Sequence, residues 1–245
     1  MQLALAALLA LVCAACGPAR EETTVFAAAS LRDVCGELGA AYEARAGEPV
    51  RFHFAGSNLL ARQILAAPGA DAFLSADEAQ MDVVDRAGHV APGSRVSLLS
   101  NRLVVVVPRD PDPGITAPAD LTRVRRLSLA NPEQVPAGRY ARDWLERRAL
   151  WAPLADRVLP ALDVRAALAA VESGAAEAGI CYATDLDRAR GVRLAFAIPD
   201  EESPAISYAA CAVDDSERGR AFVAFLVSPE ARAAFERHGF RVLAR

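Results

Sequence analysis

The sequence contains no lysine. All 27 basic residues among its 245 are arginines, and they stand against 31 Asp and Glu residues, so that the formal charge is −4. A surface that binds nucleic acid needs an excess of positive charge gathered on one face. Because this chain is mildly acidic overall, nucleic acid is not an expected partner.

Long apolar runs are absent after the first sixteen residues. No later segment approaches the roughly 20 consecutive apolar residues that a membrane-spanning helix needs, which excludes a protein built from several such spans. Hydrophobic residues nevertheless make up 53% of the chain. A chain of this length and composition can form one large domain or two lobes of about 100 residues each.

Charge is absent from the first sixteen residues, which read MQLALAALLALVCAAC. A short apolar stretch followed by the polar sequence GPAREE is typical of a signal peptide. We predict that residues 1–16 form a signal peptide of the lipoprotein type, because two small residues, Ala14 and Ala15, precede Cys16, the candidate for lipidation. The expected location is the periplasm or the outer face of the cell membrane, with membrane contact only through this anchor.

The cysteines are few and suggest no redox or metal chemistry. Cys13 and Cys16 spell C-x-x-C, but they lie inside the apolar leader rather than in the strand-and-helix context of a redox motif. Cys35, Cys181 and Cys211 are interpreted as small buried residues. A single bridge between Cys181 and Cys211, which both lie in strand-like runs, is the alternative.

Strand-like and helix-like patterns alternate along the rest of the chain. Strands are predicted at 23–30, 50–55, 71–75, 103–108, 127–130, 178–182, 192–197 and 206–213. Helices are predicted at 31–46, from 57, and at 78–87, 137–148, 164–173, 217–226 and 229–238. The repeated strand–helix unit predicts an α/β fold with a mostly parallel sheet and helices on both of its faces.

The chain is expected to change lobe twice. The apolar run 103–108 is followed by a Pro- and Asp-rich stretch from Arg109 to Asp120, which indicates a boundary close to residue 100. We predict a first lobe of residues 17–100 and 213–245 and a second lobe of residues 101–212.

Four junctions between a strand and the next helix are candidate binding positions. Ligands of open α/β sheets bind beyond the carboxyl ends of the strands, where helix N-termini expose unpaired N–H groups. Ser30 fits a capping box with Asp33, and Ser57, Ala137 and Val164 each stand at the start of a predicted helix. These positions indicate a site that favours anions, and ordinary helix caps would explain them equally well.

Longer motifs contain these junctions in a fixed order. They are TVFAAASL at 24–31, FAGSNLLARQI at 54–64, DAFLSAD at 71–77, NPEQVPAGRYA at 131–141, DVRAALAAVE at 163–172, GICY at 179–182 and HGF at 238–240. This order resembles that of the periplasmic molybdate-binding proteins of ABC transporters, and the resemblance extends from residue 23 to residue 245.

The resemblance implies a two-lobed fold of the type II periplasmic-binding-protein class. Each lobe would be a mixed, mostly parallel sheet flanked by helices, with the ligand cleft between the lobes. It further implies a monomer with no cofactor and no direct metal ligands, because molybdenum would enter only as its oxyanion. The implied partners are molybdate or tungstate and an ABC permease with its ATPase.

The resemblance also implies which residues hold the oxyanion. Ser30 and Ser57 would donate through hydroxyl and backbone N–H groups, Ala137 and Val164 through backbone N–H groups, and Tyr182 through its hydroxyl. A fully ionised dianion needs donors alone, and such a site offers no acceptor to an oxyanion that carries a proton. Removing residues 1–16 leaves the charge at −4, so local donors rather than net attraction would supply the affinity.

Three other functions remain in view. A carrier of another tetrahedral oxyanion, such as sulfate, would use the same kind of site. A serine-type hydrolase is disfavoured, since the chain lacks G-x-S-x-G and its histidines His53, His89 and His238 show no pairing with a serine. A cation carrier is disfavoured because His, Cys, Asp and Glu nowhere stand at ligand spacing. The protein is therefore not expected to be an enzyme.

Overall fold

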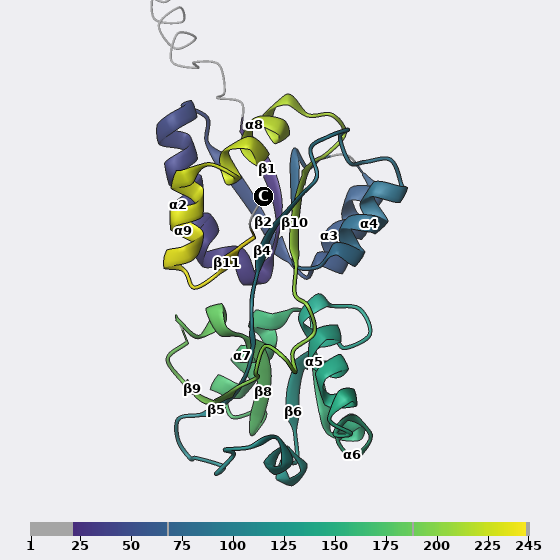
Figure 1. Cartoon of the computed structure of the whole chain (residues 1–245), viewed down its shortest axis with the longest axis vertical. Coiled ribbons are helices and arrows are strands. Elements are labelled where there is room, and N and C mark those ends of the chain that lie inside the picture. The colour runs from purple at the N-terminus through teal and green to yellow at the C-terminus, as the bar shows by residue number, and fades with distance from the viewer. Residues whose placement is uncertain (1–21, 68, 188, 244–245) are drawn as a thin grey trace, which may run out of the picture.

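The computed structural model describes residues 22–67, 69–187 and 189–243. Two sheets lie one above the other in an elongated molecule, each flanked by helices (Figure 1). The predicted signal peptide at 1–16, with the lipidation candidate Cys16, lies outside the described residues. Within the described residues, no helix combines the length and the apolar character that a membrane span requires.

The first sheet has six strands. In spatial order they are β11 (Arg241–Val242), β4 (Val96–Ser100), β10 (Tyr208–Ala212), β3 (Ala72–Ser75), β1 (Thr23–Ala28) and β2 (Val50–Ala55). β1 pairs in parallel with β2 and β3. β10 runs antiparallel to β3 and β4, and β11 antiparallel to β4. The carboxyl ends of β1, β2 and β3 therefore meet at one edge, which faces the other sheet (Figure 1).

The second sheet has five strands. In spatial order they are β7 (Val158–Ala161), β6 (Leu127–Ala130), β8 (Ala178–Tyr182), β5 (Leu103–Pro108) and β9 (Val192–Ala197). β6 is parallel to β7 and β8, whereas β5 is antiparallel to β8 and β9. Both sheets are mixed, as predicted, but the expectation that they are mostly parallel is wrong, because antiparallel pairs outnumber the parallel ones among the described strands. The apolar and alternating patterns indicate strands but not the direction in which they pair.

Helices cover the faces of both sheets. The first sheet carries η1 (Ala29–Leu31), α2 (Arg32–Ala46), α3 (Ser57–Ala66), α4 (Glu78–Arg86), α8 (Glu217–Leu226) and α9 (Pro229–Arg237). The second carries η2 (Pro118–Arg123), α5 (Pro136–Arg147), α6 (Trp151–Leu154), η3 (Ala155–Arg157), α7 (Val164–Glu172) and η4 (Ala183–Leu186). Apolar side chains at helical spacing, such as Val34, Leu38 and Tyr42 of α2, are buried against the sheet.

The chain crosses between the sheets twice. β4 ends at Ser100 in the first sheet and β5 begins at Leu103 in the second. The return crossing lies between β9 and β10, and residues 208–212 already pair with β3 and β4 of the first sheet. The predicted boundary between 212 and 213 is therefore too late, because the apolar pattern of 206–213 predicts a strand without indicating which strands it pairs with.

The three cysteines within the described residues are buried and free. Cys181 lies in β8 of the second sheet and Cys211 in β10 of the first. The alternative of a bridge between them is therefore wrong, and burial accounts for all three side chains.

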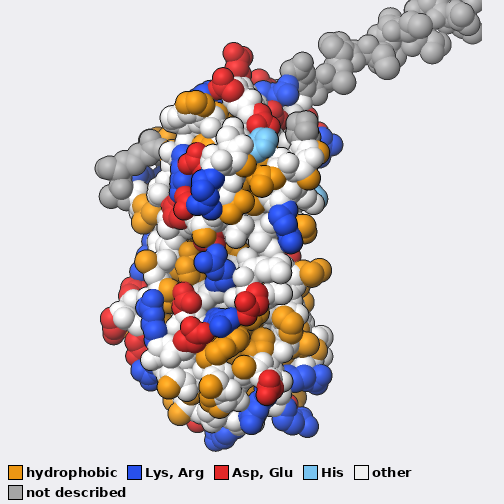
Figure 2. Space-filling model, turned by 90° about the vertical axis from the view of Figure 1, so that its right-hand side faces the viewer, with side chains coloured by type: hydrophobic (Ala, Val, Ile, Leu, Met, Phe, Trp, Pro, Cys, Tyr) orange, Lys and Arg blue, Asp and Glu red, His pale blue; other side chains and the backbone are white. Residues whose placement is uncertain are grey.

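Charge is mixed over the surface. On the face shown in Figure 2, acidic and basic side chains of the described residues are interspersed, and no extended basic patch covers it. On this face, the distribution agrees with the mildly acidic composition.

Candidate functional site

A small cavity lies where the two lobes meet, beyond the carboxyl ends of β1, β2 and β8. It is lined by Ser30, Ser57, Ala137, Val164 and Tyr182 together with their neighbours at the strand-to-helix junctions. None of these five residues is more than 3% exposed. Only about 10 Å³ is open to the centre of a water-sized sphere, which is about the room that one water molecule needs, so the cavity is small.

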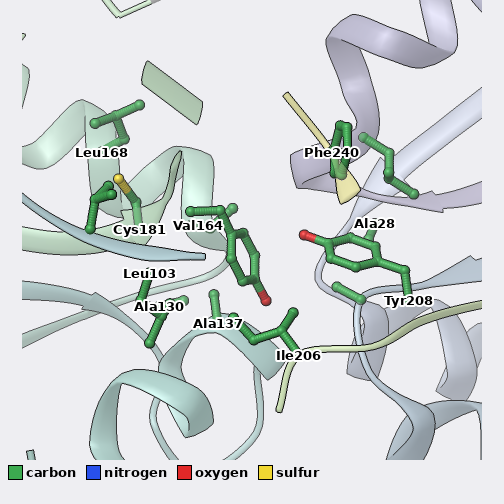
Figure 3. Packing of buried hydrophobic residues seen from close by; sticks show 14 of the residues in the cluster. Ala28, Leu103, Ala130, Ala137, Val164, Leu168, Cys181, Ile206, Tyr208 and Phe240 are labelled. Atoms are coloured by element: carbon green, nitrogen blue, oxygen red, sulfur yellow. The ribbon is translucent and has the colours of Figure 1, made fainter. Parts of the chain in front are cut away.

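The lining comes from both lobes. Ser30 and Ser57 belong to the first lobe, whereas Ala137, Val164 and Tyr182 belong to the second. Figure 3 shows Ala137 and Val164 on one side of the space between the lobes and Ala28 on the other. The five residues that the motifs singled out are thus brought together, although they are spread over more than half of the chain.

Ser30 lies in η1, one turn before α2. No side chain caps α2, whose N-cap residue is Leu31, so the predicted capping box between Ser30 and Asp33 is wrong. The intervening 3-10 turn moves Ser30 away from the first N–H groups of α2, and its Oγ lies 3.0 Å from the hydroxyl oxygen of Tyr208. Asp33 instead pairs with Arg165 of the second lobe, at 2.6 Å.

Ser57 is the first residue of α3. Its Oγ accepts a hydrogen bond of 3.0 Å from the backbone N–H of Ala76. The hydrogen of its own hydroxyl is therefore left for the cavity. At the preceding residue, Gly56, the second lobe comes close: a Cβ there would lie 3.0 Å from the carbonyl oxygen of Leu162.

Ala137 and Val164 present backbone groups. Ala137 is the second residue of α5, after Pro136, and Val164 is the first residue of α7. The N–H groups of a first helical turn have no partner within the helix and carry its positive end. The carboxylate of Asp163 caps α7 by accepting from the N–H of Ala166 at 2.9 Å. The N–H of Val164 takes no part in this cap.

Tyr182 ends β8 and is completely buried. Its hydroxyl has no hydrogen-bond partner among the described residues. Burial raises the pKa of this phenol well above its usual range, so it is a neutral donor. A buried hydroxyl without a partner costs roughly 1–3 kcal/mol, and an acceptor atom placed in the cavity would remove that cost.

Carboxylates near the cavity are engaged elsewhere. Asp77 caps α4 through the N–H of Gln80, at 2.9 Å, and its burial raises its pKa. Asp185 accepts from the backbone N–H of Tyr182 at 3.1 Å and lies 2.8 Å from Nε of Arg165. Burial raises the pKa of Asp185 to about 7. Among the described lining residues, Asp163 alone has a charged side chain, and it is turned toward its own helix.

The described histidines take no part in the cavity. His89 pairs with Asp214 at 2.6 Å and His238 with Glu37 at 3.0 Å, while the ring of His53 lies against Phe26. Neither Ser30 nor Ser57 therefore has a histidine base beside it, as a hydrolase would need. No group of three or more His, Cys, Asp or Glu side chains in the described part of the chain could hold a metal ion.

No pattern in the sequence indicates the contacts that two residues near the site make. Tyr208 contacts Ser30, and Arg165 joins Asp33 of the first lobe to Asp185 of the second. Each lies far from its partner along the chain. Local patterns could not have indicated either contact, because Ser30 and Tyr208 are 178 positions apart and Asp33 and Arg165 lie in different lobes.

Comparison with known proteins supports this architecture. The family model described as bacterial extracellular solute-binding protein matches residues 23–241. The molybdate-binding protein of Escherichia coli (strain K12) is 36% identical over 227 residues, which cover 89% of this chain and 88% of that protein. The predicted resemblance to molybdate-binding proteins is thereby confirmed.

Two solved structures share the fold at lower identity. The periplasmic molybdate-binding protein of Azotobacter vinelandii has a TM-score of 0.80 at 22% identity, covering 91% of this chain and 100% of that one. The sulfate-binding protein SubI of Mycobacterium tuberculosis H37Rv has a TM-score of 0.78 at 17% identity, covering 91% and 87%. Taken with the family match, these findings show that the chain belongs to the family of bacterial extracellular solute-binding proteins.

Proposed function

We propose that this protein captures molybdate, and also tungstate, through neutral hydrogen-bond donors and delivers it to an ABC importer. The observation that carries the proposal is the convergence of five donor-bearing residues in one small cavity, including a buried tyrosine hydroxyl that has no partner among the described residues. The relative from Escherichia coli, whose name describes molybdate binding, supports the choice of ligand.

The donors are numerous enough for tight binding. The hydroxyl and N–H groups of Ser30 and Ser57, the N–H groups of Ala137 and Val164 and the hydroxyl of Tyr182 make about seven charge-assisted hydrogen bonds, each worth roughly 1.5–3 kcal/mol. The gross gain of about 10–20 kcal/mol is reduced by the costs of association and lobe closure. A net −8 to −12 kcal/mol, roughly micromolar to nanomolar, is within reach without an arginine at the ligand.

Sulfate is the nearest alternative ligand. It has the same charge and shape as molybdate but shorter bonds, so donors held at fixed positions around molybdate could not all reach its oxygens. The shared fold of the sulfate-binding structure does not favour either anion, because its identity to this chain is only 17%. We therefore expect the site to separate molybdate from sulfate by the size of the anion.

A thermal-shift comparison tests the proposed function directly. Molybdate and tungstate should each raise the melting temperature, because a ligand that binds only the folded state stabilises it by mass action. Sulfate and phosphate at the same concentration should raise it far less. An equal or larger shift with sulfate would favour the alternative carrier, and no shift with any oxyanion would contradict the site.

The Tyr182→Phe variant should separate ligand binding from folding. Affinity for molybdate should fall roughly tenfold, because an oxygen of the dianion loses a charge-assisted donor. The stability of the ligand-free protein should stay equal or rise, because the variant removes a buried hydroxyl with no described partner. Titration calorimetry and urea unfolding measure the two effects.

Tyr42→Phe is the matched control for this variant. Tyr42 is equally buried, but it packs against Phe222 and Phe225 in the first lobe and does not line the cavity. Its replacement should leave molybdate affinity unchanged. Equal affinity of the Tyr182→Phe variant and the unmodified protein would remove Tyr182 from the set of ligand donors.

The remaining features of the proposal concern location and partners. We propose a monomer that is exported by the signal peptide at 1–16, is lipidated at Cys16 and so stays at the outer face of the membrane. Its partners would be an ABC permease and the associated ATPase. Membership of an extracellular solute-binding family supports this location.

A further inference from the structure

Arg165 contacts carboxylates of both lobes. It is the second residue of α7 in the second lobe, directly after Val164. Its Nη2 donates to Oδ2 of Asp33 at 2.6 Å, and Asp33 is the second residue of α2 in the first lobe (Figure 1). Its Nε lies 2.8 Å from Oδ1 of Asp185, which belongs to the second lobe. The guanidinium group therefore joins the two lobes.

The contact between Arg165 and Asp33 is largely shielded from water. Their side chains are 21% and 25% exposed, and salt screens such a pair less than it screens one at an open surface. Asp185 is completely buried, and its contact with Nε is one of opposite charges without the alignment of a hydrogen bond. When the lobes separate, Asp185 stays with Arg165, whereas Asp33 moves away. The pair with Asp33 therefore forms only in the closed arrangement.

The same group of charges reaches ligand donors on both sides of the cavity. Asp185 accepts from the backbone N–H of Tyr182 at 3.1 Å. In the first lobe, Ser30 precedes Asp33 by three residues, in the turn that leads into α2. The distance between Asp33 and Arg165 is thus coupled to the distance between the donors of the first lobe and those of the second.

We infer that Asp33 and Arg165 are positioning residues, whose ion pair holds the lobes closed and so keeps the donors of both lobes on one ligand. The inference deepens the proposed function and rests on it, because it concerns the retention of the oxyanion in this cavity. Neither side chain lines the cavity, so both act through the position of the lobes. Breaking a shielded ion pair mainly speeds the dissociation of a complex, and we expect faster release rather than slower capture.

The Asp33→Asn variant removes the charge and keeps the size of the side chain. The dissociation rate of molybdate should rise about threefold to tenfold, because the closed arrangement loses its ion pair. The association rate should change by less than about twofold, because the open protein lacks this pair in any case. A chase of radiolabelled molybdate with excess unlabelled molybdate measures dissociation, and titration calorimetry gives the affinity. A variant that merely folded less well would bind less ligand without releasing it faster.

A double variant isolates the ion pair from the general effect of charge. Arg165→Lys keeps a positive charge for the buried Asp185, but a single ammonium nitrogen lacks the fork that contacts two carboxylates at once. In this background, Asp33→Asn should cause little further loss of molybdate affinity, because the pair is already broken. The effect of removing a negative charge near the dianion is the same in both backgrounds and cancels in the comparison.

Glu37→Gln is the matched control. Glu37 lies in the same helix as Asp33, but it pairs with Arg237 and with His238, the latter at 3.0 Å, and both of these belong to the first lobe. Its replacement should leave the dissociation rate unchanged. An equal rise in Glu37→Gln and Asp33→Asn would mean that loss of charge, not contact between the lobes, sets the rate.

A second ion pair across the cleft should matter less. Nη1 of Arg139 in α5 lies 3.6 Å from Oδ2 of Asp77 in the first lobe, and the Arg139 side chain is 44% exposed. Exposed pairs contribute little. Arg139→Gln should therefore raise the dissociation rate of molybdate less than Asp33→Asn does, by about twofold or less.

The inference and the proposed function fail in different ways. A dissociation rate that Asp33→Asn leaves unaltered, or losses of affinity that multiply in the double variant, would overturn the inference alone. Asp33→Asn decides by itself if Arg165→Lys does not fold. If the unmodified protein binds sulfate rather than molybdate, the proposed ligand is wrong, and the same variants test the ion pair with radiolabelled sulfate. If it binds neither anion, the inference falls with the proposed function.

Discussion

Replacing Ser57 by alanine should weaken molybdate binding roughly 10-fold to 150-fold. The variant removes one hydroxyl donor to a dianion, an interaction worth about 1.5–3 kcal/mol, and each 1.4 kcal/mol changes the dissociation constant about tenfold. It also leaves the N–H of Ala76 without the acceptor that it has at 3.0 Å. Titration calorimetry with molybdate measures the change.

Ser30→Ala should show a loss of similar size. Ser30 contributes one hydroxyl from the same lobe, and its removal also breaks its hydrogen bond with Tyr208. Because both serines would contact one ligand, the two losses need not add. Unchanged affinity for molybdate in both variants would contradict the assignment of these serines as ligand donors.

Ser94→Ala is the matched control for the serine variants. Oγ of Ser94 is buried and accepts from the N–H of Ala212 at 3.1 Å, much as Ser57 accepts from Ala76, but Ser94 lies outside the cavity. Its replacement should lower stability by roughly 1 kcal/mol and leave affinity unchanged. A comparable loss of affinity in Ser94→Ala would mean that the serine variants act through stability.

Replacing Gly138 by alanine should reduce both folding stability and binding. A Cβ at this position would lie 2.0 Å from the carbonyl oxygen of Ala130 and 2.6 Å from that of Asn131. These are backbone atoms, so the start of α5 must move. Overpacking of this kind costs about 1–3 kcal/mol or more. Ala137 directly precedes Gly138, so the same movement displaces the N–H of Ala137 from the cavity. Molybdate affinity should therefore fall by roughly tenfold or more.

Gly36→Ala provides the control for Gly138→Ala. Gly36 is an exposed residue within α2, away from both ends of the helix, and a Cβ there meets no atom within 4 Å. This variant should raise stability by up to about 1 kcal/mol, because alanine favours the helix more than glycine does. Urea unfolding and calorimetry measure both variants. Unaltered stability and affinity in Gly138→Ala would show that this close contact does not hold α5 in place.

Local elements were predictable because their signals are local. The helix that contains Val34, Leu38 and Tyr42 shows its buried face in the spacing of its apolar residues, and Asp163 caps α7 as its position before Val164 predicts. The start of α5 at Pro136 agrees with the preference of proline for the first turn. Each of these features depends on residues within a few positions of one another.

Features that depend on distant partners were missed or mistaken. β10 was assigned to the wrong lobe, because its pairing with β3 joins residues more than 130 positions apart. The predicted capping box between Ser30 and Asp33 is wrong, because the S-x-x-D pattern does not reveal the 3-10 turn that contains Ser30 and precedes α2. The hydroxyl of Ser30 instead shares a hydrogen bond with Tyr208, which is 178 positions away.

Most of the strands and helices could be obtained from the sequence, although β4, β7 and β11 were not predicted. The resemblance to an oxyanion-binding family also came from the sequence, as did the candidate residues Ser30, Ser57, Ala137, Val164 and Tyr182. Their meeting in one cavity, the partners of each hydroxyl and the contacts between the lobes depended on the folded chain. The physical reason is that periodicity and capping preferences act over a few residues, whereas the direction of a hydrogen bond in a cleft depends on groups from both lobes. A site made of neutral donors depends on that second kind of contact, because its donors come from both lobes.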